Sequence, residues 1–252
     1  MCLGGGGDLQ LFELKHITKN YHEISNETQA IADVSFSVHD GELLSIVGPS
    51  GCGKSTLLSI ISGLEKPSSG KVIFVRLVKM GYMPQLDHLF EWRDILSNAC
   101  IGLEIQKTKT KENIEYVTNM LKQYGLGDFM HHYPSQLSGG MRQRAALIRT
   151  LAVRPDILLL DEPFSALDYQ TRLYVAEEIT EIIRQQQKTA ILVTHDISEA
   201  ISVSDRVIVL SARPSRISAE HKIVLTPGVK PREAPEFREY FNAIWKELNI
   251  RG

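Results

Sequence analysis

The amino-acid sequence predicts an α/β fold, and three observations point to it. Strand-sized apolar runs alternate with helical patterns over residues 157–210, which is typical of a parallel sheet covered by helices. An apolar run at 42–47 leads into a glycine-rich loop and then into a helical segment. Strand patterns are absent from 84–155, where helical patterns replace them. We therefore expect an α/β core interrupted by a helical insertion.

The first third of the chain predicts two kinds of strand. Residues 9–13 alternate weakly, as an edge strand does, whereas 34–38 alternate cleanly, as a half-buried antiparallel strand does. A helix is predicted at 55–62, and Gly63 ends it. The other strands of this third are short runs at 42–47, 71–75 and 79–83.

The insertion and the last third predict mostly helices. Asp168 and Asp196 begin two of them, because an aspartate side chain accepts hydrogen bonds from free backbone N–H groups. The helices are predicted at 94–105, 112–124, 138–149, 168–187, 196–203 and 237–248, and the strands at 157–160, 190–194 and 207–210. We expect the last helix to pack on its own domain, and the alternative is a helix that binds a partner.

Composition narrows the classes of function. The 252 residues carry a formal charge of −2, which argues against a DNA-coating protein, because such proteins need clustered Lys and Arg. No run approaches the roughly 20 apolar residues of a transmembrane helix, and no signal peptide is readable. Cys2, Cys52 and Cys100 are widely spaced, so we expect reduced thiols.

A phosphate-binding loop is predicted after the strand at 42–47. The pattern GxxxxGK[ST] is matched by Gly48, Pro49, Ser50, Gly51, Cys52, Gly53, Lys54 and Ser55, and Thr56 completes the segment predicted to bind nucleotide. Glycines let backbone N–H groups surround phosphate oxygens, and the N-terminus of the next helix favours an anion. We expect Lys54 to contact the β- and γ-phosphates and the Ser55 hydroxyl to ligate Mg²⁺.

Two carboxylates, Asp161 and Glu162, end the apolar strand at 157–160. Ligands of open α/β sheets bind beyond the carboxyl ends of strands. We expect Asp161 to hold Mg²⁺ and Glu162 to act as the general base on an attacking water. Such a strand end is often only structural, but with the phosphate loop it predicts nucleotide hydrolysis.

The segment Leu137-Ser138-Gly139-Gly140 lies between these two motifs. Ser138 is predicted to cap a helix, so its hydroxyl and the following N–H groups form a second anion site. With LSGG in this position, the sequence resembles the ATP-binding cassette (ABC) family, the ATPase subunits of ABC transporters. The resemblance covers about residues 9–225.

Four further residues resemble elements of that family. Asp168 stands in its D-loop and is implied to contact nucleotide. Gln85 resembles the Q-loop glutamine, a catalytic group and Mg²⁺ ligand. His195 resembles the switch histidine at the γ-phosphate. Tyr21, ahead of the first paired strands, resembles the aromatic residue that stacks on adenine, with plain packing as the alternative.

The resemblance implies a P-loop NTPase core with a RecA-like mixed sheet and an antiparallel β subdomain. Within one ABC ATPase domain, 1–252, it places the core at 8–84 and 156–225, a helical signature subdomain at 85–155, and a C-terminal helix at 226–252. It implies ATP and Mg²⁺ as cofactors. It also implies a head-to-tail homodimer in which Ser138 and Gly140 complete the partner's site.

The resemblance also implies membrane partners. Permease subunits would be contacted near 85–95, a solute-binding protein would act indirectly, and the chain would be peripheral on the cytoplasmic face of the membrane. Nucleic acid is not expected as a partner. In cassettes of nitrate, sulfonate and taurine importers a Pro-Trp pair lies in this segment, and here Glu91-Trp92 is a partial match. Other similarities to these importers lie at 164–168, 197–200 and 210–217.

The chain departs from most cassettes in two places. Only 14 residues separate Gly70 from Gln85, which predicts a trimmed antiparallel subdomain. The C-terminal segment leaves no room for the extra β domain of many sugar and metal-ion importers. We therefore expect the energy-coupling ATPase subunit of an importer of small solutes.

Three alternatives stay open at this stage. The first is the ATPase subunit of an exporter. The second is a non-transport ABC ATPase of DNA repair or translation, against which the lack of heptad arms and of a second cassette argues. The third is an interaction protein with an inactive site, against which Lys54, Asp161, Glu162 and His195 argue.

Overall fold

The structure is a computed structural model that describes residues 9–22 and 27–249. It divides into two compact units: the first is Met1–Val78 with Thr189–Gly252, and the second is Lys79–Lys188. The domain boundaries predicted near 84 and 156 stay a prediction. Within the described ranges, no helix has the length and apolar character that crossing a membrane requires.

The first unit holds both parallel and antiparallel strands. They are β1 (Gln10–His22), β2 (Glu27–His39), β3 (Leu43–Val47), β4 (Ser69–Phe74), β7 (Thr189–Thr194), β8 (Arg206–Leu210) and β9 (Ser215–Lys222). Their order is β4-β1-β2-β9-β8-β3-β7. β1 pairs antiparallel with β2 and β4, and β3 pairs parallel with β7 and β8. β9 joins the two parts, antiparallel to β8 and parallel to β2.

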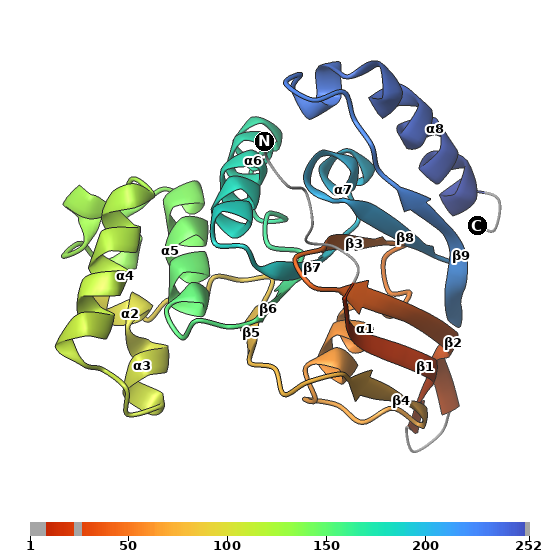
Figure 1. The fold of residues 1–252 in the computed structure, drawn as a ribbon, viewed down its shortest axis with the longest axis horizontal. Coiled ribbons are helices and arrows are strands. Elements are labelled where there is room, and N and C mark those ends of the chain that lie inside the picture. The colour runs from red at the N-terminus through yellow and green to blue at the C-terminus, as the bar shows by residue number, and fades with distance from the viewer. Residues whose placement is uncertain (1–8, 23–26, 250–252) are drawn as a thin grey trace. The chain divides into compact units, whose positions relative to one another are not determined.

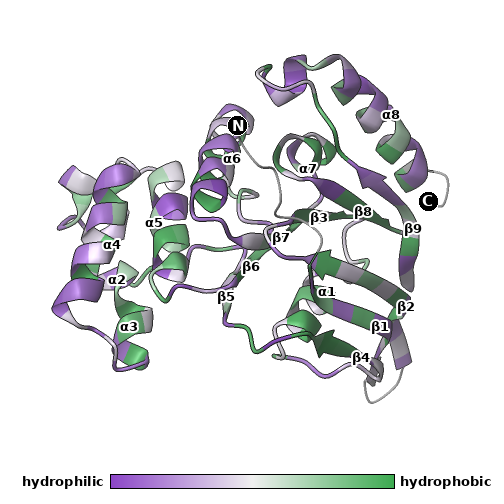
Figure 2. Ribbon diagram, in the orientation of Figure 1, coloured by the Kyte–Doolittle hydropathy of each residue, from purple (hydrophilic) through white to green (hydrophobic). Residues whose placement is uncertain are grey.

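Helices of the first unit are α1 (Lys54–Ile61), α7 (Ile197–Val203) and α8 (Pro235–Asn249). All residues of β3 are buried, as expected for a parallel strand covered on both faces. α8 carries both polar and apolar residues (Figure 2) and packs on α7, β8 and β9 (Figure 1). Its Ile244 is fully buried in that cluster. The expectation that this helix packs on its own domain is therefore confirmed.

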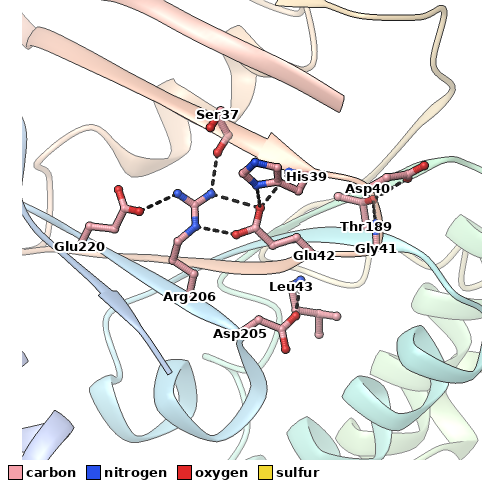
Figure 3. A network of polar contacts seen from close by, with 10 residues as sticks. All are labelled: Ser37, His39, Asp40, Gly41, Glu42, Leu43, Thr189, Asp205, Arg206 and Glu220. Atoms are coloured by element: carbon pink, nitrogen blue, oxygen red, sulfur yellow. Dashed lines mark hydrogen bonds and ion pairs between the residues drawn. The ribbon is translucent and has the colours of Figure 1, made fainter. Parts of the chain in front are cut away.

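A network of polar contacts joins strand ends in the first unit (Figure 3). The Arg206 guanidinium donates hydrogen bonds to both carboxylate oxygens of Glu42 and to the Ser37 carbonyl. It also pairs with Glu220 at 2.9 Å. These residues come from β2, from the residue before β3, from β8 and from β9, so one half-buried cation connects four segments of the sheet.

The second unit pairs β5 (Met80–Met83) in parallel with β6 (Ile157–Asp161). Its helices are α2 (Ile95–Ala99), α3 (Ile101–Ile105), α4 (Lys111–Gln123), α5 (Gly139–Leu151) and α6 (Tyr169–Gln185). Short 3₁₀ turns lie at Gly127–Phe129 and Pro134–Gln136, and a third, Pro231–Glu233, lies in the first unit. Residues 84–155 contain helices and turns and no strand, as predicted.

The helix predicted at 94–105 is instead two short helices. Cys100 ends α2 and also begins α3. A Cβ on Gly102 would lie 2.6 Å from Cγ1 of Val153, so α3 approaches its neighbour at this point more closely than a side chain permits. Cys52 and Cys100 are buried free thiols, as expected, and Cys2 lies outside the described residues.

Candidate functional site

The phosphate loop connects β3 to α1 in the first unit. Lys54 is only 5% exposed, and its Nζ donates hydrogen bonds to the carbonyls of Gly48 at 2.8 Å and Pro49 at 3.0 Å. A buried ammonium is stable only when its N–H groups have partners. The loop carbonyls supply these partners and hold the amine against the loop.

The loop backbone needs glycine at two positions. Gly51 has φ +73° and Gly53 has φ +108°, values that residues with a Cβ rarely adopt. No atom lies within 4 Å of the position that a Cβ on Gly51 would occupy. This open concave backbone, next to a lysine and the exposed Ser55, has the donors that a nucleotide with Mg²⁺ requires.

Cys52 fills the inside of the loop. Its side chain is fully buried, and a Cβ on Gly48 would lie 2.8 Å from its Sγ. Burial raises the pKa of the Cys52 thiol, so it stays protonated at neutral pH. The residue therefore acts as a small packing group.

Tyr21 lies within β1, opposite Thr28 of β2, and not ahead of the paired strands as expected. The sequence prediction ended the strand early, because the long hairpin is polar near its tip. The Tyr21 hydroxyl donates a hydrogen bond of 2.8 Å to Glu65, and its oxygen lies 3.3 Å from Thr56 Oγ1, within hydrogen-bond distance. Burial raises the pKa of Tyr21. The aromatic ring is thus attached to the helix that follows the phosphate loop.

His195 is exposed between β7 and α7, and its two neighbours are held in place. Thr194 Oγ1 donates a hydrogen bond to buried Glu199 at 2.8 Å and accepts one from the backbone N–H of Asp196 at 3.0 Å. The Asp196 carboxylate accepts hydrogen bonds from the first turn of α7, as predicted. Glu199 was not predicted as a support for this loop, because its burial is not visible in the sequence.

In the second unit, Asp161 ends β6 and is 9% exposed. The hydroxyl of Tyr82, from β5, donates a hydrogen bond of 3.0 Å to Asp161 Oδ2. Glu162, the next residue, has φ +44°, a left-handed conformation that is unfavourable for a glutamate. The left-handed residue therefore ends the strand directly after Asp161.

Gln85 follows β5, and its Nε2 donates a hydrogen bond of 3.1 Å to Ser165 Oγ. Ser165 belongs to the turn after Glu162 and donates its own N–H to the Glu162 carbonyl. The structure therefore places Gln85 next to the predicted D-loop. Asp168 is exposed, and its side chain accepts the Thr171 N–H and caps α6, as predicted.

The segment after Gln85 is bound to α5. Arg149 donates hydrogen bonds to the carbonyls of Asp87 at 2.7 Å and His88 at 2.8 Å, and Arg142 pairs with the Asp87 carboxylate at 3.2 Å. Burial lowers the pKa of Arg149. Two arginines of the helix that begins at the LSGG segment thus fix the chain beyond Gln85.

Ser138 caps α5, and its hydroxyl accepts the Met141 N–H at 3.3 Å. The two glycines that follow are required by close packing. A Cβ on Gly139 would lie 2.8 Å from Leu167, and one on Gly140 would lie 2.8 Å from Val175. The glycines of the LSGG pattern therefore have a packing role inside the second unit.

The predicted site residues fall into two sets. Tyr21, His195 and the loop residues 48–56 belong to the first unit. Members of the second unit are Gln85, Ser138, Gly139, Gly140, Asp161, Glu162 and Asp168. Tyr82 and Glu65 touch these residues and were not predicted, because each contact joins segments that the sequence separates.

Known proteins that are similar to this chain support the nucleotide-binding motifs described above. Residues 31–165 match the protein family described as ABC transporter. The chain is 44% identical over 254 residues to the uncharacterized ABC transporter ATP-binding protein YtlC of Bacillus subtilis (strain 168), covering 96% of each chain. It is 38% identical over 244 residues to the taurine import ATP-binding protein TauB of Roseobacter denitrificans, covering 90% of this chain and 91% of that one.

A solved structure is also similar. It is a dimeric ATP-binding cassette in a post-hydrolysis state, bound to ADP and Pi, with a TM-score of 0.73 and 32% identity. The match covers 85% of this chain and 99% of that chain. The predicted fold class is therefore confirmed. The chain belongs to the ABC transporter family and is one of its ATP-binding subunits, an ATPase that uses ATP with Mg²⁺.

Proposed function

We propose that this chain is the energy-coupling subunit of an importer for small sulfonates of the taurine class. The similarity to a taurine import ATP-binding protein over 90% of the chain supports this substrate class. Similarities at 164–168, 197–200 and 210–217 support the same importer group, whose known cargo also includes nitrate. A solute-binding protein outside the membrane would select the cargo.

The nucleotide chemistry follows from the side chains of the two units. Lys54 and the N–H groups of 48–56 bind the phosphates, with Thr56 at the start of α1. Ser55, Asp161 and Gln85 would hold Mg²⁺, which would neutralise phosphate charge. Glu162 orients and deprotonates the attacking water as general base.

Three further residues complete the proposed nucleotide contacts. His195 contacts the γ-phosphate, and its exposed position at the end of β7 supports this role. Tyr21 stacks on the base, and its attachment to Thr56 supports that role. Asp168 contacts nucleotide from the D-loop, and its exposed position supports this role.

The proposal that the chain couples to membrane subunits depends on exposed apolar side chains in the segment 86–95 of the second unit. Trp92 is 73% exposed and Leu86 58% exposed, while the Trp92 ring packs on Phe90 at 4.9 Å between centroids. Exposed apolar side chains in one segment support an interaction surface there. We therefore propose that membrane permease subunits dock at 85–95, which places the chain on the cytoplasmic face of the membrane.

Asn98 holds this surface in place. The side chain is fully buried, accepts the Phe90 N–H at 2.7 Å, and donates to the carbonyls of Phe90 and Arg93 at 3.0 Å. The loop carrying Trp92 is therefore rigid, although its tryptophan is exposed. A rigid apolar projection transmits a movement better than a mobile one does.

The test of this function is solute uptake in cells from which the gene is deleted. Wild-type chain should restore uptake of labelled taurine, whereas Glu162→Gln and Trp92→Ala should not. Trp92→Ala should keep the ATPase activity of the purified chain, because it changes only the docking surface. Restored efflux in place of uptake would support an exporter and contradict the proposal.

We also propose a head-to-tail homodimer in which each ATP is held between Lys54 of one subunit and Ser138 and Gly140 of the other. Lys54→Ala and Ser138→Arg chains should each be inactive alone. Mixed together, they form dimers with one intact composite site, so a fraction of the ATPase activity should return. No recovery in a mixture shown to contain heterodimers would overturn shared sites.

A further inference from the structure

Lys19 and Glu65 surround the side chain of Tyr21 in the first unit. One oxygen of Glu65, Oε2, accepts hydrogen bonds from the Tyr21 hydroxyl at 2.8 Å and pairs with Lys19 Nζ at 3.0 Å. Lys19 Nζ also donates to the Lys66 carbonyl at 2.9 Å and lies over the Tyr21 ring, 5.0 Å from its centroid. The ammonium therefore has three partners, one of which is a ring face.

This arrangement fixes the ring to the phosphate-loop helix. Thr56, in the first turn of α1, places its Oγ1 at 3.3 Å from the Tyr21 hydroxyl oxygen, within hydrogen-bond distance. Glu65 follows the end of the same helix, and its N–H donates to the Ser59 carbonyl at 3.1 Å. Both anchors of the hydroxyl thus move with α1, so the distance from the ring to the phosphate loop is set by this unit alone.

The contacts of Glu65 stabilise the ionised form of its carboxyl group. Although partial burial raises its pKa, hydrogen bonds from Tyr21 and Lys19 together hold the pKa of the Glu65 carboxyl below its ordinary value. The carboxylate is therefore ionised at neutral pH, and the side chain of Lys19, 15% exposed, stays over one face of the ring. A flat aromatic ligand has only the opposite face on which to stack.

We propose that Lys19 and Glu65 are positioning residues for nucleotide binding: they fix the Tyr21 ring relative to the phosphate loop and leave one face for the base. The proposal rests on the base-stacking role given to Tyr21 above. It predicts that disturbing the pair weakens binding of a ligand with a base and spares a ligand without one.

The experiment compares ATP with inorganic tripolyphosphate on the purified full chain. Glu65→Ala should raise the KM for ATP about tenfold, within the range of a lost base–aromatic stack, and change kcat by less than about twofold. The inhibition constant of tripolyphosphate should stay within about twofold of wild type. Lys19→Met should act in the same direction.

A matched control lies on the same strand. Lys15 and Glu13 form an exposed pair at 3.2 Å in β1, so Glu13→Ala removes a similar charge with no aromatic partner. It should leave both constants unchanged. Tyr21→Ala should raise the KM at least as much as Glu65→Ala, and the double variant should show little further loss, because both changes remove one interaction.

The outcomes separate the two hypotheses. If Tyr21→Ala raises the KM and Glu65→Ala does not, positioning by Glu65 is wrong while the role of Tyr21 stands. If Glu65→Ala weakens tripolyphosphate as much as ATP, the residue supports the whole loop and the inference is also wrong. If Tyr21→Ala leaves the KM unchanged, base stacking itself fails and this inference fails with it.

Discussion

The Tyr82 hydroxyl donates a hydrogen bond of 3.0 Å to Oδ2 of Asp161, across the pair of strands β5 and β6. In the register of these strands, Tyr82 lies opposite Leu159, two residues before Asp161. The phenol therefore reaches along the strand to the carboxylate that we assign to Mg²⁺. A partner of this kind orients a metal ligand without touching the metal.

Tyr82→Phe removes one hydroxyl and keeps the ring. We expect the Mg²⁺ concentration for half-maximal ATPase activity to rise roughly tenfold, because partners of metal ligands typically contribute that much to affinity. The maximal rate at saturating Mg²⁺ should fall less. Titration of ATPase activity with Mg²⁺ at fixed ATP measures both values.

Tyr116→Phe is the control for that change. The Tyr116 hydroxyl donates a hydrogen bond of 3.3 Å to Gln186, in the same unit and away from the predicted Mg²⁺ ligands. Its Mg²⁺ dependence should match wild type. Equal shifts in the two variants would mean that the loss of any such hydroxyl disturbs the unit, and the positioning role of Tyr82 would be refuted.

The pair of Arg206 and Glu42 makes a prediction about stability. Their side chains are 13% and 11% exposed, and the guanidinium also binds Glu220 (Figure 3). Glu42→Ala leaves a half-buried cation without its main partner, which costs about 1–3 kcal/mol of unfolding free energy. Urea denaturation measures the loss. Glu13→Ala breaks an exposed pair and should cost less than about 1 kcal/mol. Similar losses in both variants would contradict a larger contribution of the half-buried pair to stability.

Glu104 is expected to make the unfolding free energy fall more steeply as the pH decreases below about 4. Hydrogen bonds from Lys109 and then Arg93 lower the pKa of Glu104 below its ordinary value. A lowered native pKa stabilises the fold above the unfolded-state value, about 4.3, and this stabilisation is lost as the pH falls through the native value. Glu104→Gln should therefore flatten the decline of unfolding free energy below about pH 4. Parallel curves for the two proteins, measured by urea denaturation across pH, would contradict this.

Arg149 links the signature helix to the segment beyond Gln85, and its loss should affect both stability and rate. Arg149→Met leaves the carbonyls of Asp87 and His88 without their donor, which costs about 1–3 kcal/mol. ATPase activity should fall as well, because Gln85 lies two residues before Asp87. Arg149→Lys should be intermediate, since one ammonium does not reproduce the fork of a guanidinium. Lys111→Met, at an exposed position of α4 in the same unit, serves as the control and should change neither quantity. Full ATPase activity in Arg149→Met would show that the contacts of Arg149 are not needed for ATP hydrolysis.

Local patterns predicted much of the fold. Asp168, Asp196 and Ser138 cap helices where the sequence placed them, because capping depends on a few neighbouring residues. The strand β9 was missed. Its sequence is mostly polar, and its residues belong to the sheet only because β8 and β2 lie on its two sides.

Site residues whose roles depend on contacts between distant segments could not be predicted from the sequence. The motifs identify Tyr21 and Asp161 by type and order. They contain nothing about Glu65 or Tyr82, whose roles depend on a hydroxyl and a carboxylate that folding brings within 3.0 Å. The left-handed backbone at Glu162 was also not predicted, because glutamate has no preference for it.

That backbone at Glu162 has a consequence for protein engineering. Asparagine and glycine adopt φ values near +44° more readily than glutamate or glutamine does. Glu162→Asn should therefore give an inactive chain with a higher melting temperature than Glu162→Gln. The wild type would then retain a conformationally unfavourable side chain at the cost of stability, because catalysis selects for the longer carboxylate.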